Sequence, residues 1–209
     1  MPHPIPIPNI IEPNKKEELT LELGKDDRPF TMTELANTIS TFKLNKAPGP
    51  DGITIEIIKK IFPTCGDVLL KIYNRCLKLG VFFTIWKTGR LITIKKPGKE
   101  TLTIKDHRPI TLLDVFGKIL DKMITRRLNW RAENEGWINE RQYGFRPGRN
   151  TEEALEHLYN KILDNHRHLT FIILFEIQGA FDNAWWGKIL NCLLEKKCPQ
   201  NLYRLISSF

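Results

Sequence analysis

The most restrictive feature of the sequence is an apolar run at residues 171–177, interrupted only by Glu176. The run is far shorter than the about 20 residues that a membrane-spanning helix needs, so it predicts a buried strand. Gly179 and Ala180 break the strand pattern, and a helical pattern follows from Trp186. Burying a carboxylate is costly unless it is paired, hydrogen-bonded or bound to a metal. We therefore expect Glu176 to have either a structural partner or a cation.

Size and composition are those of a globular protein with one large domain or two small ones. The chain has 209 residues, of which 41% are hydrophobic and 27% are charged. The sequence shows no membrane-length apolar run and no signal-peptide layout, which predicts an intracellular protein of the cytoplasm and nucleus. Four cysteines lack both metal-ligand spacing and a dense disulfide framework, which favours free thiols. They are Cys65, Cys76, Cys192 and Cys198.

Positive charge is concentrated in the middle third of the chain. Residues 84–149 contain 15 Lys and Arg but only seven acids, so this segment carries the whole net charge of +8. A basic zone within an otherwise balanced chain suggests a polyanionic partner, such as nucleic acid or nucleotide phosphates. A solvated basic face is the alternative, and charge alone does not decide between the two.

Apolar periodicity and capping residues predict a mostly helical chain. A capping box of Thr31 and Glu34 begins the first helix, which we expect to end at Asn45. Further helices are predicted at 53–62, 67–79, 117–134, 186–196 and 200–207. Another is predicted from Asn150 or Thr151 to about 166, and its inward side chains would be Ala154, Leu155, Leu158 and Ile162. A short strand at 91–94 leads into a basic turn at 95–99, which indicates the tip of a hairpin. The loop 47–52 contains two prolines and two glycines, so we expect it to have a defined shape.

Two basic segments are candidates for binding nucleic acid. The helix predicted at 117–134 has an apolar side and a basic side, and the basic side includes Arg126 and Arg127. The loop 142–149, Gln-Tyr-Gly-Phe-Arg-Pro-Gly-Arg, alternates aromatic residues with arginine. Aromatic side chains stack on bases while arginines neutralise phosphates. A loop held by buried Tyr143 and Phe145 is the alternative interpretation.

Taken together and in order, several motifs resemble one family, the reverse transcriptases of non-LTR (LINE-type) retrotransposons. The similarity is to the Jockey-like elements and to the insect elements that insert into ribosomal RNA genes. The motifs are Lys-Ala-Pro-Gly-Pro-Asp-Gly-Ile at 46–53, Trp-Lys at 86–87, Lys-Pro-Gly-Lys at 96–99, Arg-Pro-Ile-Thr-Leu-Leu at 108–113 with Gly-Lys at 117–118, the loop 142–149 with Thr-Glu at 151–152, and Gly-Ala-Phe-Asp-Asn at 179–183 with Trp-Trp at 185–186. The resemblance covers about residues 28–209.

The resemblance implies an α+β chain with the right-hand polymerase fold. Residues 1–30 would be an extended lead-in, 31–170 the mostly helical fingers, and 171–209 the first strand and helix of an incomplete palm. The implied substrate is a deoxynucleotide triphosphate, and the implied partners are an RNA template and a DNA primer. The membrane is not an expected partner.

The family's site residues carry over by position. Lys95 or Lys96, together with Arg108, would grip the triphosphate, because clustered cations neutralise phosphate charge and arginine can hold two oxygens at once. Phe181 would exclude a ribose 2′-hydroxyl. Glu176 stands at the position of the first catalytic aspartate and would be a ligand of Mg²⁺. The expected nucleic-acid contacts are Lys99, Arg126, Arg127, Gln142, Arg146 and Arg149.

Two departures from the family pattern bear on activity. Glu176 is one methylene longer than aspartate, and Mg²⁺ demands near-ideal octahedral geometry. The family's paired aspartates in an aromatic-Ala-Asp-Asp hairpin are absent from this sequence, whereas two-metal transfer needs ions about 3.5–4 Å apart. The leading hypothesis is therefore an RNA-directed DNA polymerase fragment or degraded copy that is inactive alone. The alternatives are a non-catalytic nucleic-acid-binding relic and a decayed product without function.

Overall fold

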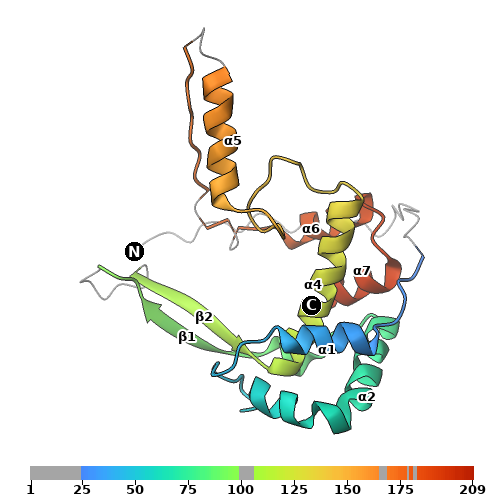
Figure 1. Cartoon of the computed structure of the whole chain (residues 1–209). Helices are drawn as coiled ribbons and strands as arrows, with labels where there is room; N and C mark the ends of the chain where they lie inside the picture. The colour runs from blue at the N-terminus through green and yellow to red at the C-terminus, as the bar shows by residue number, and fades with distance from the viewer. Residues whose placement is uncertain (1–24, 99–105, 165–168, 178, 181–182) are drawn as a thin grey trace, which may run out of the picture.

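The computed structural model describes residues 25–98, 106–164, 169–177, 179–180 and 183–209. Within them the chain forms seven helices and two strands (Figure 1). In chain order these are α1 (Met32–Ser40), α2 (Ile55–Leu79), α3 (Thr84–Lys87), β1 (Gly89–Lys95), β2 (His107–Leu113), α4 (Val115–Asn134), α5 (Thr151–Asp164), α6 (Trp186–Glu195) and α7 (Gln200–Ser207). A helical body holds the core. The β1–β2 hairpin and an arm, defined as α5 with residues 169–177, project from this body.

The core of the body is assembled from helices that are far apart in the sequence. Tyr73 of α2 is fully buried, and its hydroxyl donates a hydrogen bond to the Phe116 carbonyl at 3.0 Å, which satisfies the polar end of an otherwise apolar side chain. Around it lie the fully buried side chains of α1, α4 and α7, namely Leu35, Ile119, Leu120, Leu202 and Leu205. The body therefore needs all four helices to exclude water from its centre.

Segments near the two ends of the described chain meet on the body. The Asp27 N–H donates to Asn201 Oδ1 at 2.9 Å, and Asn201 Nδ2 donates back to the Asp27 carbonyl at 2.8 Å. Phe30 is 3% exposed, and its N–H donates to Asn74 Oδ1 at 2.6 Å. The end of the predicted lead-in therefore belongs to the body.

The first helix begins where the capping box predicts and ends earlier than expected. The Glu34 N–H donates to Thr31 Oγ1 at 3.1 Å, and the Thr31 N–H donates to Glu34 Oε2 at 2.7 Å. The helix ends at Ser40 rather than Asn45. The Ser40 and Thr41 hydroxyls donate to backbone carbonyls of the preceding turn, and such bonds compete with continued helix.

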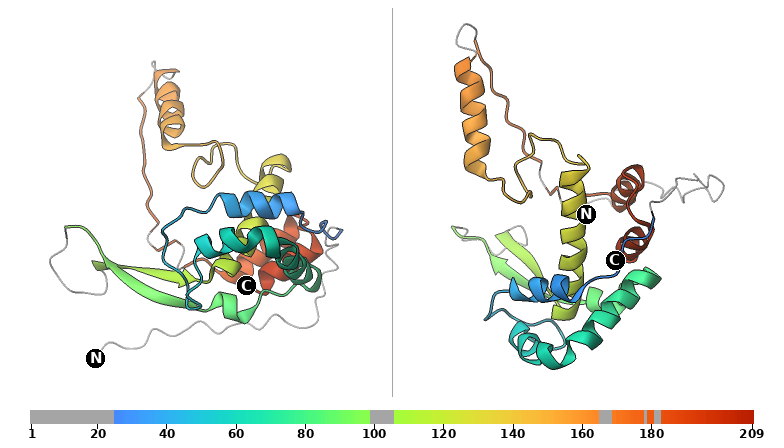
Figure 2. Two further views of the ribbon diagram at one scale, coloured as in Figure 1. Left: turned by 60° about the horizontal axis from the view of Figure 1, so that its bottom comes forward. Right: turned by 45° about the vertical axis from the view of Figure 1, so that its right-hand side comes forward.

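Residues 55–79 form one helix, whereas the sequence predicted two. Pro63 lies inside α2, and the helix bends near its middle (Figure 2). Proline removes one backbone hydrogen bond and commonly kinks a helix without ending it when packing holds both halves. Both halves of α2 contribute to the core, Ile58 before the bend and Leu69 after it. Gly80, with φ 64°, caps the helix, which ends at Leu79 as predicted.

The hairpin predicted around the basic turn is confirmed. Strands β1 and β2 pair antiparallel from Gly89↔Leu113 to Lys95↔His107. Most side chains of the ribbon are exposed. Pro109 is tolerated within β2 because both strands are sheet edges, where a missing N–H need not break a ladder bond.

The prediction of a buried strand at 171–177 is wrong. These residues have no strand assignment, and their side chains are exposed, with Leu174 88% and Phe175 89% accessible. Apolar content indicates a tendency toward burial but does not supply a strand with the hydrogen-bonded neighbour it needs, and the described residues offer none here. The expected inward face of α5 is not buried either: Leu155 and Leu158 are exposed, and Ala154 and Ile162 are only half-buried. Leu158 and Ile162 instead lie beside residues 170–173 within the arm.

The described residues contain neither a membrane-spanning helix nor a disulfide. None of the helices described is long and apolar enough to cross a membrane. All four cysteines are free, as predicted, and burial raises the pKa of both Cys76 and Cys198 to about 11. These two buried thiols are consequently protonated at neutral pH.

Candidate nucleic-acid interface

Near its tip, the hairpin places two cations on a common face. Arg108 lies opposite Ile94, and Lys95 lies opposite His107. The N–H of Lys96 extends the ladder by one further residue. Opposite residues of an antiparallel pair share a face, and successive residues alternate between faces. Lys96 therefore shares a face with Arg108, whereas Lys95 lies on the other face. The sequence left Lys95 and Lys96 as equal candidates, and the register favours Lys96.

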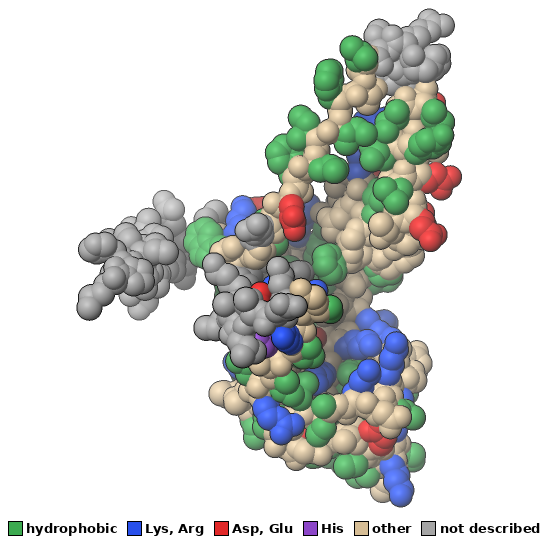
Figure 3. Space-filling model, turned by 90° about the vertical axis from the view of Figure 1, so that its left-hand side faces the viewer, with side chains coloured by type: hydrophobic (Ala, Val, Ile, Leu, Met, Phe, Trp, Pro, Cys, Tyr) green, Lys and Arg blue, Asp and Glu red, His purple; other side chains and the backbone are tan. Residues whose placement is uncertain are grey.

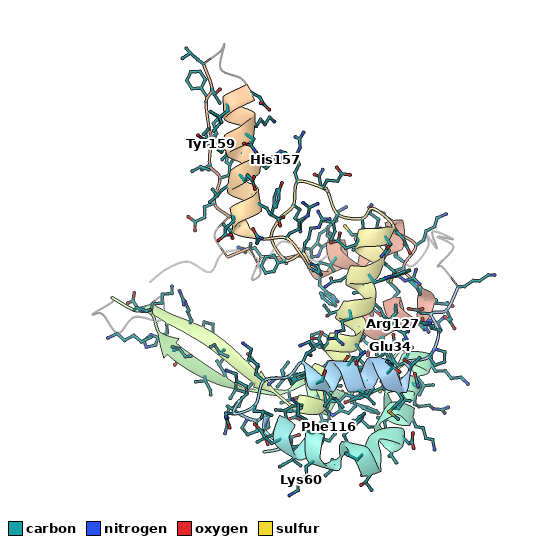
Figure 4. The ribbon with its side chains drawn as sticks, viewed as in Figure 1. Glu34, Lys60, Phe116, Arg127, His157 and Tyr159 are labelled. Carbon is teal, nitrogen blue, oxygen red and sulfur yellow. The ribbon has the colours of Figure 1, made fainter. Side chains whose placement is uncertain are left out.

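Arg127, which the sequence predicted as a nucleic-acid contact, does not face solvent. Its side chain is 9% exposed, and its Nε and Nη2 donate to both Glu34 carboxylate oxygens at 3.0 Å. Its Nη1 lies 3.4 Å from Asp27 Oδ2, and the guanidinium stacks over the Phe30 ring at 4.3 Å. Figure 4 shows Arg127 beside Glu34 where α4 meets α1. All these contacts join α4 to the segment 27–34.

The pairing of Glu34 with Arg127 makes the stability of the fold decrease with pH in the acidic range. Burial favours the protonated form of Glu34, but hydrogen bonds from Arg127 and Thr31 together with the Arg127 charge hold its pKa below the usual value. A lowered folded-state pKa contributes stability above the unfolded-state pKa, and that contribution is lost as pH falls through the folded-state pKa. We expect the melting temperature to fall between about pH 5 and pH 3, and to fall less in Glu34→Gln. Thermal melts followed by circular dichroism measure both, and equal slopes would contradict the assignment.

Arg126, the neighbour of Arg127, is exposed to solvent. One residue along a helix turns the side chain by about 100°, so Arg126 is exposed while Arg127 is buried. Arg126 Nη1 donates to Thr38 Oγ1 at 3.0 Å. The predicted basic side of α4 is thus two rows. The inner row of Arg127 and Arg131 pairs with acids, and the outer row contains Arg126.

Arg146, also predicted as a nucleic-acid contact, holds the loop 142–149 in shape. Its Nη2 and Nε donate to the Glu133 carboxylate at 2.6 and 2.9 Å, and its Nη1 donates to the carbonyls of Asn139 and Gln142. Only 9% of the side chain is exposed. The hydrogen bonds from Arg146 lower the pKa of Glu133. A guanidinium committed to four local acceptors has little capacity left for a phosphate.

The other residues of this loop remain at the surface. Phe145 is 87% exposed, so the alternative of a loop held by two buried aromatics is wrong. Tyr143 is half-buried, and the Arg149 guanidinium lies 5.5 Å from its ring centroid. Arg149 also pairs with Glu153 at 3.8 Å. Gln142 is exposed, with its amide donating to the Gly144 carbonyl. Phe145, Arg149 and Gln142 therefore keep the surface exposure that contact with nucleic acid requires.

The residues described do not assemble a metal site around Glu176. This side chain is exposed, so the expected desolvation of its carboxylate does not occur. No group of three or more His, Cys, Asp or Glu able to hold an ion is present in the described part of the chain. The donor set thus does not fit a two-Mg²⁺ centre. Phe181 and Lys99 lie outside the described residues.

Four further lysines come together that the sequence did not single out as site residues. Lys43 and Lys46 follow α1, and Lys118 and Lys122 lie in the first turns of α4. The only signal in the sequence is the four-residue spacing of the last two, which puts them on one helix face. Their proximity to the first two comes from the packing of α1 against α4.

Comparisons with known proteins decide the family. The model of the reverse transcriptase (RNA-dependent DNA polymerase) family matches residues 94–209, more than half of the chain. The chain belongs to the reverse transcriptase family. The prediction from the ordered motifs is thereby confirmed, as is the mixed helical and strand content expected of this polymerase fold.

Curated relatives agree with the resemblance to non-LTR retrotransposons. The chain is 32% identical to the RNA-directed DNA polymerase from mobile element jockey of Drosophila funebris, over 87% of this chain and 20% of that protein. It is 27% identical to the probable RNA-directed DNA polymerase from transposon BS of Drosophila melanogaster, over 92% of this chain and 21% of that protein. A putative 115 kDa protein in the type-1 retrotransposable element R1DM of Drosophila melanogaster is 31% identical over 80% and 16%. The chain spans about a fifth of the length of these relatives.

Proposed function

We propose that this reverse transcriptase chain forms the fingers and the beginning of the palm of a right-hand polymerase, with the fingers at 31–170 and the palm from 171. In this role it binds an RNA template, a DNA primer and a deoxynucleotide triphosphate. The observation that carries the proposal is the common face of Lys96 and Arg108 on the projecting hairpin. Two cations on one face of an exposed ribbon suit a triphosphate, because arginine binds two phosphate oxygens and lysine adds a point charge.

Several surface residues would extend this contact to the nucleic acid. Arg126 on α4 and Arg149 in the 142–149 loop are exposed cations. Gln142 and Phe145 add a polar side chain and an aromatic surface on which a base stacks. Arg127 and Arg146 support these positions through their ion pairs and are not contacts themselves. Glu176 and Phe181 keep their predicted roles as the first acidic position and the sugar-discriminating aromatic.

The hairpin register gives a matched experiment. We expect Lys96→Gln and Arg108→Gln each to weaken binding of a fluorescent deoxynucleotide triphosphate about tenfold, since hydrogen bonds between charged groups contribute about 1.5–3 kcal/mol. Lys95→Gln removes the same charge from the opposite face and should change the affinity less than twofold. Fluorescence anisotropy measures the three affinities. Equal losses in all three variants would show that only net charge matters and would contradict the proposed grip.

A non-catalytic nucleic-acid-binding relic is the second candidate. The exposed position of Glu176 and the lack of a described cluster of acids favour it. Reverse transcriptases generally depend on metal ions, and Mg²⁺ would neutralise and align the reacting phosphates, but the residues described do not form its site. The relic should bind RNA with strong salt dependence, lose affinity in Arg149→Gln, and bind no isolated triphosphate. Triphosphate binding that depends on Lys96 and Arg108 separates the two candidates.

A further inference from the structure

A pocket rich in lysine lies on the body, outside the hairpin. Its volume is about 310 Å³, and it is formed where the end of α1, the start of α2 and the first turns of α4 meet. Four lysines line it and no Asp or Glu does. They are Lys43, Lys46, Lys118 and Lys122. Figure 3 views the molecule from the side on which the hairpin projects and shows Lys and Arg side chains gathered on the body beneath the arm.

The backbone that bears Lys43 and Lys46 is held in place. Lys59 Nζ donates to the Phe42 carbonyl at 2.8 Å, and Glu56 Oε1 accepts the N–H of Asn45 at 2.5 Å. The Lys122 ammonium lies 4.8 Å from the centroid of the Phe42 ring. The four lysines thus come from two elements whose relative position is fixed by these contacts. A pocket with a fixed wall loses little conformational entropy when it binds a ligand.

The positive charge of the four pocket lysines is not neutralised by ion pairs within the described residues. None of the four takes part in an ion pair within the described part of the chain. Among the acids outside the lining, Asp51 interacts electrostatically with Lys118 and with Asp114. These two acids are engaged with each other and with backbone N–H groups, Asp114 Oδ1 accepting from the Asp51 N–H at 3.2 Å. Like charges spaced i,i+4 on a helix repel, so an anion in the pocket would relieve repulsion between Lys118 and Lys122.

We propose that this lysine pocket binds a backbone phosphate of a nucleic-acid strand. The proposal rests on the nucleic-acid binding proposed above and adds a contact outside the hairpin. A polymer suits the surface better than a small anion because the basic row continues past the pocket. Lys118, Lys122 and Arg126 follow each other at four-residue intervals on α4, about 6 Å apart along the helix axis. A strand can therefore place one phosphate in the pocket and the next beside Arg126.

Salt dependence of RNA binding tests the pocket. The full 209-residue chain is titrated with a fluorescein-labelled oligouridylate over a series of NaCl concentrations. Each phosphate contact to a single strand contributes about 0.7 to the slope of log affinity against log salt. We expect Lys118→Gln/Lys122→Gln and Lys43→Gln/Lys46→Gln each to reduce the slope by about 0.7. Lys60→Gln is the matched control, because Lys60 is exposed on the far side of α2 (Figure 4) and should leave the slope unchanged.

Thermal melts with and without tripolyphosphate form the second arm and confirm folding. Lys43 and Lys46 are both exposed, so their double variant provides a result even if the α4 variant does not fold. If the folded variants show the same slope of log RNA affinity against log salt as the wild type, the pocket does not bind a backbone phosphate. RNA binding by the wild type would still support the proposed function in that case. Absence of RNA binding by the wild-type chain overturns both. If tripolyphosphate raises the melting temperature of the wild type only, while RNA slopes stay equal, the pocket holds a free phosphate and the backbone assignment fails.

Discussion

Replacing Arg127 by methionine is expected to lower the free energy of unfolding by about 3 kcal/mol, because it leaves the partly buried Glu34 without its ion pair and Asp27 with only the longer pair to Arg131. The guanidinium joins Glu34, Asp27 and the Phe30 ring in one contact network. Methionine keeps most of the apolar stem, so the loss reports the charge and its hydrogen bonds rather than a cavity. Urea denaturation followed by tryptophan fluorescence and circular dichroism measures the change.

Arg131→Met is the matched control on the same helix. Arg131 is 23% exposed and lies 3.7 Å from Asp27, so this more solvated pair should contribute less than about 1 kcal/mol. An Arg127→Met protein that is as stable as the wild type, yet binds RNA less tightly, would contradict the structural role and restore the role that the sequence predicted for Arg127.

Replacing Gly49 by alanine is expected to cost about 3 kcal/mol, the upper part of the range for overpacking a tight site. An added Cβ would lie 2.3 Å from Asp114 Oδ1, 2.5 Å from the Asp114 nitrogen and 2.6 Å from the Leu113 carbonyl carbon. Two of these three atoms are backbone at the junction of β2 and α4, so they cannot rotate away as a side chain would. The same denaturation experiment measures the loss.

Gly52→Ala provides the comparison within the same loop. Gly52 has φ 71° and no atom within 4 Å of the position of an added Cβ. Its substitution should therefore cost only the strain of a left-handed backbone, about 1 kcal/mol. If the two variants lose equal stability, backbone conformation rather than the close approach of Gly49 to Asp114 explains the requirement for glycine.

Local chemistry in the sequence predicted most of the helical elements. The capping box of Thr31 and Glu34 marks the start of α1 and Gly80 follows the predicted end at 79, and the structure places helix ends there. Each of these signals acts within a few residues, so it does not depend on the rest of the fold. The same is true of the hairpin at the basic turn.

The sequence did not predict features that depend on distant partners. Whether Arg127 faces phosphate or Asp27 is decided by the 27–34 segment, which lies nearly a hundred residues away in the chain. The apolar run at 171–177 signals a strand, but its burial requires neighbouring strands that the described residues do not provide. The lysine pocket likewise exists only because α1 packs on α4. Periodicity identifies a face of an element and leaves its neighbour undetermined.

The reciprocal hydrogen bonds between Asp27 and Asn201 have a consequence for biosynthesis. They join residues 174 positions apart, and α7 supplies Leu202 and Leu205 to the core that Tyr73 shares. During translation at about 5–20 residues per second, the ribosome finishes α1, α2 and α4 well before α7 exists. Because loop closure over such separations is slow, the nascent body must wait with apolar helix faces exposed. The body can therefore close only after α7 has been synthesised.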